Sequence, residues 1–301
     1  MKITQIGLLI AICTITSCKK ESQNNLSPTP EPRLIFKFKF DATQDRLGSN
    51  GQLISVPAGN GAQSPIFNKM SANYIELSPV ATTALGAGKV LYRAPERTLP
   101  TMDKAIEFSQ SNPVGEGETL FSLPLKEAIG TYAYLRLSLA YQNYNIQFRV
   151  TVAGQTTDQT STIASFIGYR TYIESVKVKN QTLAVNDAKL QGFWAFENPL
   201  TNTINFGQAP QGATTVPNPL FATSPIPAGS CVVTGAFLDN NLITPLVITG
   251  TETNDITIQV SLSTNQSFEW TDTNPNGKWE PLLNEPVVDM GIRGMKPFIQ
   301  K

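Results

Sequence analysis

The chain contains no histidine, and this absence excludes more functions than any other feature of its composition. Without an imidazole, neither a Ser-His-Asp nor a Cys-His catalytic arrangement can form, and no metal site can use a histidine ligand. The chain also lacks an excess of charge of one sign, since Lys and Arg total 23 and Asp and Glu total 23 among 301 residues. We therefore expect no nucleic acid partner, because there is no surplus of cations to displace the counterions of the phosphates.

The sequence also lacks any apolar run of roughly 18 residues or more, the length that a membrane-spanning helix needs. It has instead a shorter apolar run over residues 6–15, which follows Lys2 and leads into the sequence ITSC at residues 15–18. This pattern resembles the lipobox of bacterial lipoproteins, in which an aliphatic residue and two small residues precede a cysteine. The resemblance implies a signal peptide over residues 1–17, cleavage before Cys18 and acylation of Cys18 with fatty acids such as palmitate.

The segment over residues 18–33 is polar and has a proline at every second position from 28 to 32. Such spacing favours an extended, semi-rigid chain, so we expect a tether that holds the folded body away from the membrane. The membrane would be a partner through the lipid anchor alone. The resemblance to lipoproteins implies a cell-envelope location at the outer membrane, because residue 19 is lysine and not the aspartate that retains such proteins at the inner membrane. Whether the protein is periplasmic or surface-exposed stays open.

Cysteine is scarce, with three residues in the chain. Cys13 would be removed with the signal peptide and Cys18 would be lipidated, which leaves Cys231 in the apolar sequence SCVV. No intrachain disulfide is therefore expected, and the body must be stabilised by a hydrophobic core. Without a histidine to activate it, Cys231 is predicted to be a buried, inert thiol.

Helical patterns are scarce as well, whereas alternation of apolar and polar residues recurs along the whole chain. Phe36, Phe38 and Phe40 alternate with lysines, and similar alternation covers residues 133–139, 146–152 and 256–262. A period of two is typical of strands with one buried face, so the fold class is predicted to be all-β. The polar sequence QNYN at residues 142–145 is a plausible hairpin connection between two of these strands.

The body is longer than one ordinary β-sandwich of about 100 residues. We predict one or two β-sandwich-like domains behind the tether, with a division into residues 34–180 and 181–301 favoured. The second part contains a segment rich in Pro, Gly, Thr and Asn over residues 198–229, which predicts a long irregular loop. A single larger sandwich with long loops is the alternative.

One motif carries recognisable chemistry, the sequence DTNPNGKWE at residues 272–280. Side-chain oxygens recur at every second position and a glycine follows at the sixth, as in the opening of a calcium-binding loop. Position 12 is leucine, so the pattern is similar to the shorter extracellular calcium repeats and not to a helix-loop-helix hand. The candidate ligands are Asp272, Asn274, Asn276, the carbonyl of Lys278 and Glu280, and Glu285 or Asp289 could complete the shell. Calcium would have a structural role, and a simple Asn-Gly hairpin turn is the alternative.

Four tyrosines offer a second candidate site. Tyr132, Tyr134, Tyr141 and Tyr144 could form an aromatic platform for a carbohydrate or a protein ligand, although aromatic residues on strands mostly serve cross-strand packing. No catalytic signature is present, so an enzyme is not expected.

Three functions remain from the sequence. The favoured one is a noncatalytic cell-envelope lipoprotein that binds or scaffolds an unknown protein or carbohydrate. The second is a carbohydrate-active enzyme that works with carboxylates, which need no histidine. The third follows from a resemblance: residues 36–40, 70–77 and 130–132 resemble the periplasmic binding-protein family associated with methanobactin, which implies a periplasmic metal- or ligand-handling protein. Copper binding is not carried over, because this chain lacks the histidine of that family.

Overall fold

The computed structural model describes residues 31–48, 52–210 and 231–300. In these residues the regular structure consists of strands and three short 3-10 helices, so the all-β prediction is confirmed. None of the helices in the described part is long and apolar enough to cross a membrane. The predicted signal peptide, the lipidation site at Cys18 and most of the predicted tether lie outside the described residues.

The first strand of the described chain lies in a four-stranded sheet with the order β22-β19-β1-β7. β1 and β19 are far apart in the sequence but run parallel side by side, with Phe36 opposite Ile258 and Phe38 opposite Val260. Phe36 and Phe38 are buried as the alternation predicts, while Phe40 is half-buried. The strands of this sheet are β1 (Arg33–Asp41), β7 (Thr119–Pro124), β19 (Ile256–Ser263) and β22 (Met295–Gln300).

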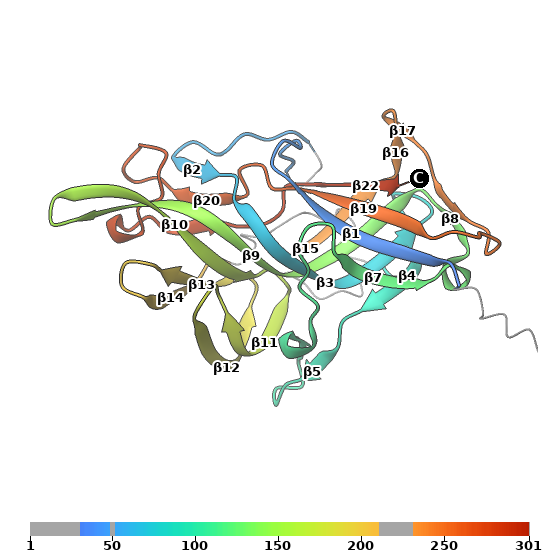
Figure 1. Ribbon diagram of the computed structural model, residues 1–301, viewed down its shortest axis with the longest axis horizontal. Helices are drawn as coiled ribbons and strands as arrows, with labels where there is room; N and C mark the ends of the chain where they lie inside the picture. Colours follow the sequence, from blue (N-terminus) through green and yellow to red (C-terminus); the bar gives the residue numbers. More distant parts are fainter. Residues whose placement is uncertain (1–30, 49–51, 211–230, 301) are drawn as a thin grey trace, which may run out of the picture. The chain divides into compact units, whose positions relative to one another are not determined.

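A curled seven-stranded sheet is built around β9, a strand of 19 residues (Figure 1). The order is β14-β13-β10-β9-β3-β4. Two strands pair with the same edge of β9: β15 with its first half and β10 with its second half. The strands are β3 (Ile66–Ser78), β4 (Lys89–Arg93), β9 (Tyr134–Val152), β10 (Gln155–Phe166), β13 (Phe193–Asn198), β14 (Thr203–Gln208) and β15 (Cys231–Ala236).

Strands from both sides of the predicted division near residue 180 pair with one another. β10 pairs with β13 in the seven-stranded sheet, and β1 pairs with β19 in the four-stranded sheet. The described residues from Glu31 onward form one compact unit. Within the predicted loop over residues 198–229, β14 forms a hairpin with β13, and residues 211–230 lie outside the described part.

Four smaller sheets and the short helices complete the body. One has the order β12-β11-β6-β5 and another the order β2-β20-β21, while β16 pairs with β17 and β18 pairs with β8. Their bounds are β2 (Asn60–Gln63), β5 (Glu96–Thr98), β6 (Lys104–Glu107), β8 (Gly130–Tyr132), β11 (Arg170–Lys177), β12 (Thr182–Leu190), β16 (Leu238–Asp239), β17 (Leu242–Ile243), β18 (Leu246–Ile248), β20 (Phe268–Thr271) and β21 (Val287–Asp289). The 3-10 helices are η1 (Phe108–Gln110), η2 (Leu125–Ala128) and η4 (Pro281–Leu283).

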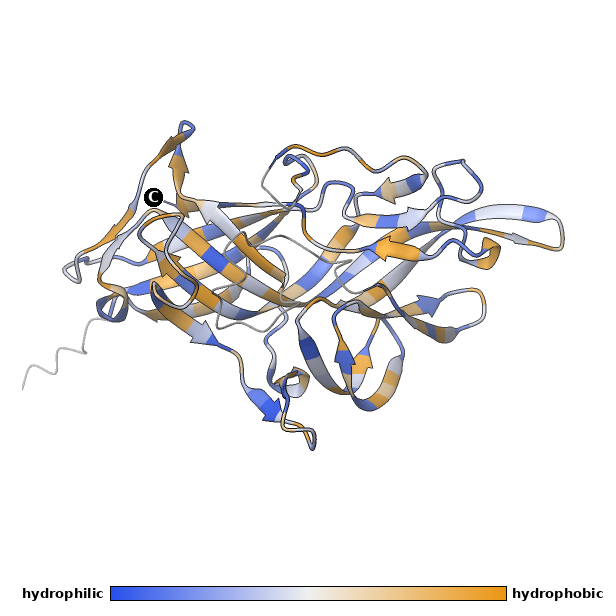
Figure 2. Ribbon diagram, turned by 180° about the vertical axis from the view of Figure 1, so that it is seen from behind, coloured by the Kyte–Doolittle hydropathy of each residue, from blue (hydrophilic) through white to orange (hydrophobic). Residues whose placement is uncertain are grey.

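Figure 2 shows apolar and polar residues alternating in bands along several strands, and in β1 the buried residues lie at every second position from Leu34 to Phe38. One hydrophobic cluster draws buried side chains from both large sheets, for example Phe36 on β1, Ile258 on β19, Ile75 on β3 and Leu137 on β9. These residues are 0% exposed. The burial of this shared cluster is the main force that holds the two sheets together.

The predicted hairpin connection at residues 142–145 is wrong. β9 runs without interruption through these residues, and the chain reverses at Ala153-Gly154, where φ is 49° and 79°. Positive φ at both central residues is the mark of a type I′ turn, whose twist matches that of the flanking strands. This turn joins β9 to β10 as a long hairpin, with Val152 paired to Gln155.

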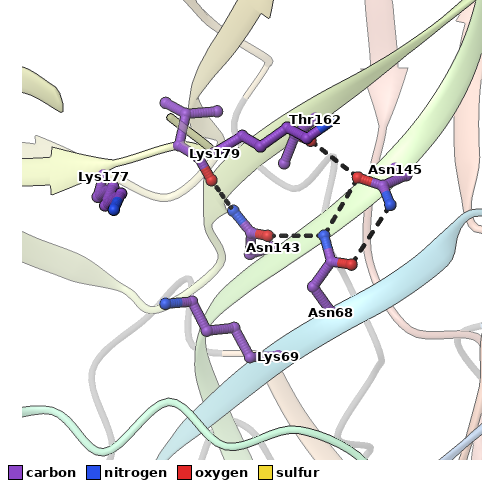
Figure 3. A pocket seen from close by; sticks show the side chains of 8 residues that line it. Asn68, Lys69, Asn143, Asn145, Thr162, Lys177 and Lys179 are labelled. Carbon is purple, nitrogen blue, oxygen red and sulfur yellow. Dashed lines mark hydrogen bonds between the residues drawn. The ribbon is translucent and has the colours of Figure 1, made fainter. Parts of the chain in front are cut away.

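The asparagines that suggested a turn are instead held by partners from other parts of the chain, Asn68 on β3 and Val178 just after β11 (Figure 3). Asn143 donates a hydrogen bond to the carbonyl of Val178, at 2.8 Å. Asn68 on β3 donates to Asn143 at 2.9 Å and to Asn145 at 3.2 Å. These cross-strand bonds replace the local bonds that make asparagine favourable in turns, and they depend on the tertiary structure.

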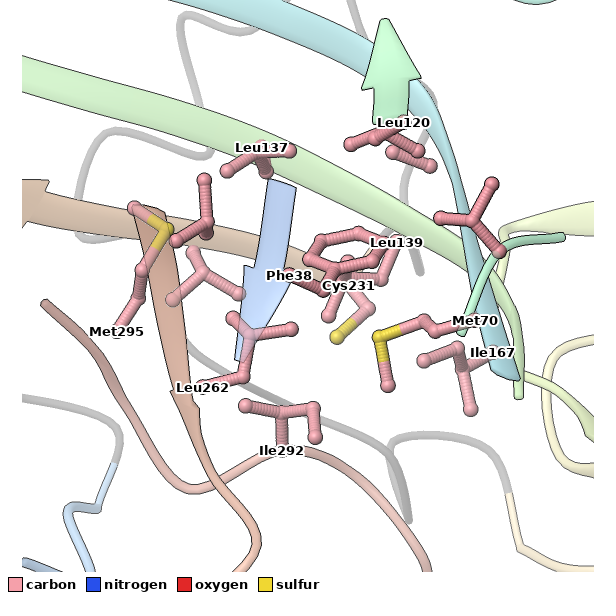
Figure 4. Packing of buried hydrophobic residues seen from close by; sticks show 14 of the residues in the cluster. Phe38, Met70, Leu120, Leu137, Leu139, Ile167, Cys231, Leu262, Ile292 and Met295 are labelled. Carbon is pink, nitrogen blue, oxygen red and sulfur yellow. The ribbon is translucent and has the colours of Figure 1, made fainter. Parts of the chain in front are cut away.

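Cys231 lies in the shared hydrophobic cluster, opposite Leu139 of β9 (Figure 4). Its side chain is 0% exposed, and Figure 4 shows it beside Phe38 and Met70. The prediction of a buried thiol is confirmed. A thiol buried in this cluster is shielded from reagents in the solvent.

Candidate metal centre

The predicted calcium loop follows β20 and is fixed to the body by one large side chain. The ring of Trp279 is 2% exposed and packs edge-on against Phe268, with ring centroids 5.2 Å apart, and against Phe148 at 6.5 Å. Its Nε1 donates to the carbonyl of Glu285 at 3.0 Å, and its own carbonyl accepts the N–H of Arg149 at 2.7 Å. The loop therefore has a fixed position relative to β9, because Trp279 cannot leave without exposing its buried surface.

The loop itself has the compact form that its sequence predicts. Gly277 has a φ of 69° and donates its N–H to Oδ2 of Asp272 at 2.9 Å, which closes a tight turn. The side chains of Asn274 and Asn276 both donate to Oε2 of Glu280, at 2.8 and 2.7 Å. The structure thus brings together the four side chains proposed as ligands.

Glu285 adds a third carboxylate to Asp272 and Glu280. Its Oε2 accepts the N–H of Glu280 at 2.6 Å and its Oε1 accepts the N–H of Asn274 at 3.2 Å. Glu280 and Glu285 are 5% and 3% exposed. Burial raises the pKa of Glu285, and the charges of Asp272 and Glu280 raise it further, although its backbone hydrogen bonds act in the opposite direction. The three carboxylates are therefore close enough to repel one another.

No lysine or arginine among the described residues forms an ion pair with these three carboxylates. Lys278 lies in the loop, but its ammonium pairs with Asp158 at 3.4 Å, and Arg149 pairs with the same carboxylate at 2.7 Å. Moreover, Oδ1 of Asp272 is buried and has no hydrogen-bond partner among the residues that the structure describes. Arg149 acts on Glu280 electrostatically but does not pair with it, and burying carboxylates without an ion-pair partner is costly, so this arrangement favours a bound cation.

The donor set suits a hard cation that takes mixed oxygen ligands. In the described part of the chain, no three His, Cys, Asp or Glu side chains converge closely enough to hold a metal ion by themselves. Calcium would therefore need amide and backbone oxygens as well, as its six to eight ligands usually include. Asn274 and Asn276 now present their NH₂ groups to Glu280, so both amides would have to rotate to present oxygen. The carbonyl of Lys278 accepts no hydrogen bond from the described residues and is available.

The four tyrosines of the predicted platform do not share an exposed surface. Tyr132, Tyr141 and Tyr144 are buried, and only Tyr134 is half-buried. Tyr141 and Tyr144 belong to different hydrophobic clusters, and the hydroxyl of Tyr132 donates to the carbonyl of Ile129 at 2.9 Å. Burial raises the pKa of all three.

A polar cleft that the sequence analysis did not identify lies at the bulge of β3. Its lining includes Asn68, Asn145 and three lysines, Lys69, Lys177 and Lys179. The sequence held one signal for it, since two of these lysines alternate with buried valines and so share one face. The partner strands that complete the cleft come from distant parts of the chain and could not be inferred.

Comparisons of the chain with protein-family models, with curated proteins and with solved structures found no match. The lipobox and the other resemblances therefore depend on the residues that carry them. The candidate sites are interpreted from their own geometry.

Proposed function

We propose that this protein is a noncatalytic lipoprotein of the cell envelope with a binding or scaffolding role at the outer membrane, and that calcium stabilises its body. The observation that carries the proposal is the loop at residues 272–285, where Asp272, Glu280 and Glu285 lie in one hydrogen-bonded loop and none forms an ion pair with a lysine or arginine of the described residues. A loop with few charged ligands is typical of extracellular modules, which bind calcium at roughly 10⁻⁴–10⁻³ M. A site of this affinity would be occupied by calcium outside the cytoplasm, which agrees with the export signal proposed at residues 1–18.

The architecture proposed with this function is a sandwich-like body. It is supported by the hydrophobic cluster that draws side chains from both large sheets. The lipid anchor on Cys18 would fix this body to the membrane, because the nearly neutral chain has no basic surplus to contribute. The anchor is tested by Cys18→Ala, which should abolish labelling with palmitate and release the protein from the membrane fraction.

Calcium binding is tested by thermal and urea unfolding of the full chain, with calcium or with a chelator. At 10 mM calcium, a Kd of 10⁻⁴–10⁻³ M corresponds to about 1.4–2.7 kcal/mol of added stability. For a body of this size, that is an increase in Tm of about 3–6 °C. No increase, or an equal increase with magnesium, would contradict the proposal.

Glu280→Gln gives the sharper test, because two opposite effects are expected. Without calcium, the variant should be as stable as the wild type or more so, since it removes one of three uncompensated charges. With calcium, it should lose most of the increase in Tm. The matched control is Asp187→Asn, which removes an exposed carboxylate paired with Lys189 on β12, away from the loop, and should retain the increase. Equal losses in both variants would indicate a non-specific effect of the cation.

A further inference from the structure

The cleft beside the β3 bulge has a volume of about 370 Å³ and polar walls. Its floor is a network of amide side chains on the face of β9 opposite the shared core. Asn143 and Asn145 lie two residues apart on this face, and Asn68 on β3 bridges them. Thr162 on β10 donates to Oδ1 of Asn145 at 2.8 Å, so three neighbouring strands contribute to the floor.

The position of Asn68 depends on an irregularity in the sheet. Phe67 pairs with Tyr144 and Lys69 pairs with Asn143, so Asn68 is the extra residue of a β-bulge. A bulge bends its strand and turns a side chain away from the regular alternation, and bulges are common beside binding sites. Here the bulge places the amide of Asn68 over β9 and also brings Lys69 to the edge of the cleft.

The opposite wall follows the end of β11. Lys177 and Lys179 are exposed and flank the buried Val178, whose carbonyl accepts a hydrogen bond from Asn143. Glu197 holds the next turn, because its Oε2 accepts the backbone N–H groups of Lys179, Asn180 and Gln181 at 2.8–3.0 Å. The lysines therefore extend from a fixed backbone, and Figure 3 shows Lys69, Lys177 and Lys179 around the amide network.

Among the described residues that line the cleft, these three lysines carry charge and no carboxylate does, while the nearby carboxylate of Glu197 is bound to backbone N–H groups. None of the three lysines forms an ion pair with a carboxylate of the described residues, although the described chain contains twelve other ion pairs. The lining has one apolar residue, Val178, and no aromatic residue. An apolar ligand is therefore disfavoured, while an anion with many hydroxyl groups would match both the ammonium groups and the amides.

We propose that this cleft binds an acidic saccharide, with its carboxylates near Lys69, Lys177 and Lys179 and its hydroxyls on the amide floor. The network fixes the amides in one orientation, and one N–H of Asn145 has no partner within the described part of the chain, so that a hydroxyl or a carboxylate oxygen can accept it. Inorganic phosphate could form ion pairs with the lysines, but it has no sugar hydroxyl groups to hydrogen-bond with the amides. The cleft would then supply the binding role proposed above, at a site that involves neither the lipid anchor nor the calcium loop.

The test is isothermal titration calorimetry on the full-length Cys18→Ser chain with tetrasaccharides of galacturonate, mannuronate and hyaluronate. The control ligands are the same saccharides with their carboxylates methyl-esterified, and inorganic phosphate. We expect at least one acidic tetrasaccharide to bind ten-fold or more tightly than its ester and than phosphate. Its affinity should fall as salt rises from 50 to 200 mM, because exposed charges are screened.

Variants separate this cleft from the rest of the surface. The double change Lys177→Gln and Lys179→Gln should weaken binding ten-fold or more, and Asn68→Ala about five-fold. The matched control Lys89→Gln removes an exposed lysine of β4 that also lacks an ion pair among the described residues, and it should leave the affinity within two-fold.

Unfolding curves check that each variant is folded. The proposal is overturned if no acidic tetrasaccharide binds, if esters or phosphate bind equally well, or if the double variant binds like the wild type. Tighter binding of single-stranded DNA of the same charge would also overturn it. Failure here leaves the calcium result unaffected, because the two sites have no residue in common.

Discussion

Glu76 and Arg136 form a cross-strand pair that is completely buried in the seven-stranded sheet. The two residues lie opposite each other on β3 and β9, both are 0% exposed, and Nη1 of Arg136 is 3.7 Å from Oε2 of Glu76. Arg136 also donates to the carbonyls of Ala81 and Thr83, at 3.1 and 2.6 Å. Glu76 accepts the N–H of Gly88 at 2.7 Å. The pair therefore holds the segment between β3 and β4 against the sheet.

We predict that Arg136→Met lowers the free energy of unfolding by about 3–5 kcal/mol. At 3.7 Å the attraction between two unit charges is about 4.5 kcal/mol for an effective dielectric constant near 20. Removal of Arg136 loses this attraction and leaves Glu76 buried without a counter-charge, which is the costly half of breaking a buried pair. Glu76→Gln should cost less, about 2–3 kcal/mol, because the remaining arginine keeps its carbonyl partners. The double variant should be less destabilised than the sum of the two by at least about 1 kcal/mol.

The assay is urea unfolding at pH 7, followed by tryptophan fluorescence. The control is Lys189→Met, which removes an exposed ion pair with Asp187 and should leave the unfolding midpoint nearly unchanged. A loss below about 1 kcal/mol for Arg136→Met, or strict additivity in the double variant, would refute the idea that the buried charges stabilise each other.

Three further predictions concern packing, reactivity and pH. Gly61→Ala should destabilise the protein by about 1–3 kcal/mol, because a Cβ would lie 2.6 Å from the fully buried ring of Trp270, and Trp270→Phe should recover part of this loss in urea unfolding. Cys231 should react with a maleimide only after denaturation, in a variant whose other two cysteines are serine; rapid labelling of the native protein would contradict its burial. Burial raises the pKa of Glu197, but the hydrogen bonds from three backbone N–H groups outweigh this effect. The pKa of Glu197 therefore lies below its ordinary value of 4.5. Its stabilisation should therefore be present above pH 4.5 and disappear as the pH falls through its folded pKa, so Glu197→Gln should cost about 1–2 kcal/mol at pH 7 and progressively less as the pH is lowered below 4.5. A constant difference across this pH range would show that the carboxylate charge is unimportant.

Alternation of apolar residues was sufficient to predict the fold class. Phe36 and Phe38 are buried as expected, and the run from Ile258 to Leu262 lies beside them in the core. The pairing could not be predicted, because β1 joins a strand from the other end of the chain. Parallel pairing of distant strands leaves no local signal in the sequence.

The candidate metal loop shows which structural features a local sequence motif can predict and which it cannot. Its spacing predicted the turn at Gly277, whereas Asn274 and Asn276, expected to present oxygens to calcium, direct their NH₂ groups to Glu280. The tertiary structure added the burial of Trp279 and the lack of a counter-cation, because the nearby cations are held by Asp158 on β10.

By itself, the sequence determined the all-β class, the exclusion of histidine chemistry and the local form of the loop at residues 272–280. Each of these depends on composition or on neighbours in the chain. Only the tertiary structure decided that Asn143 and Asn145 lie within a strand and not in a turn, because their hydrogen-bond partners come from β3, β10 and the end of β11. The same long-range pairing placed three lysines around those amides, and so created a charged cleft that no local pattern indicates.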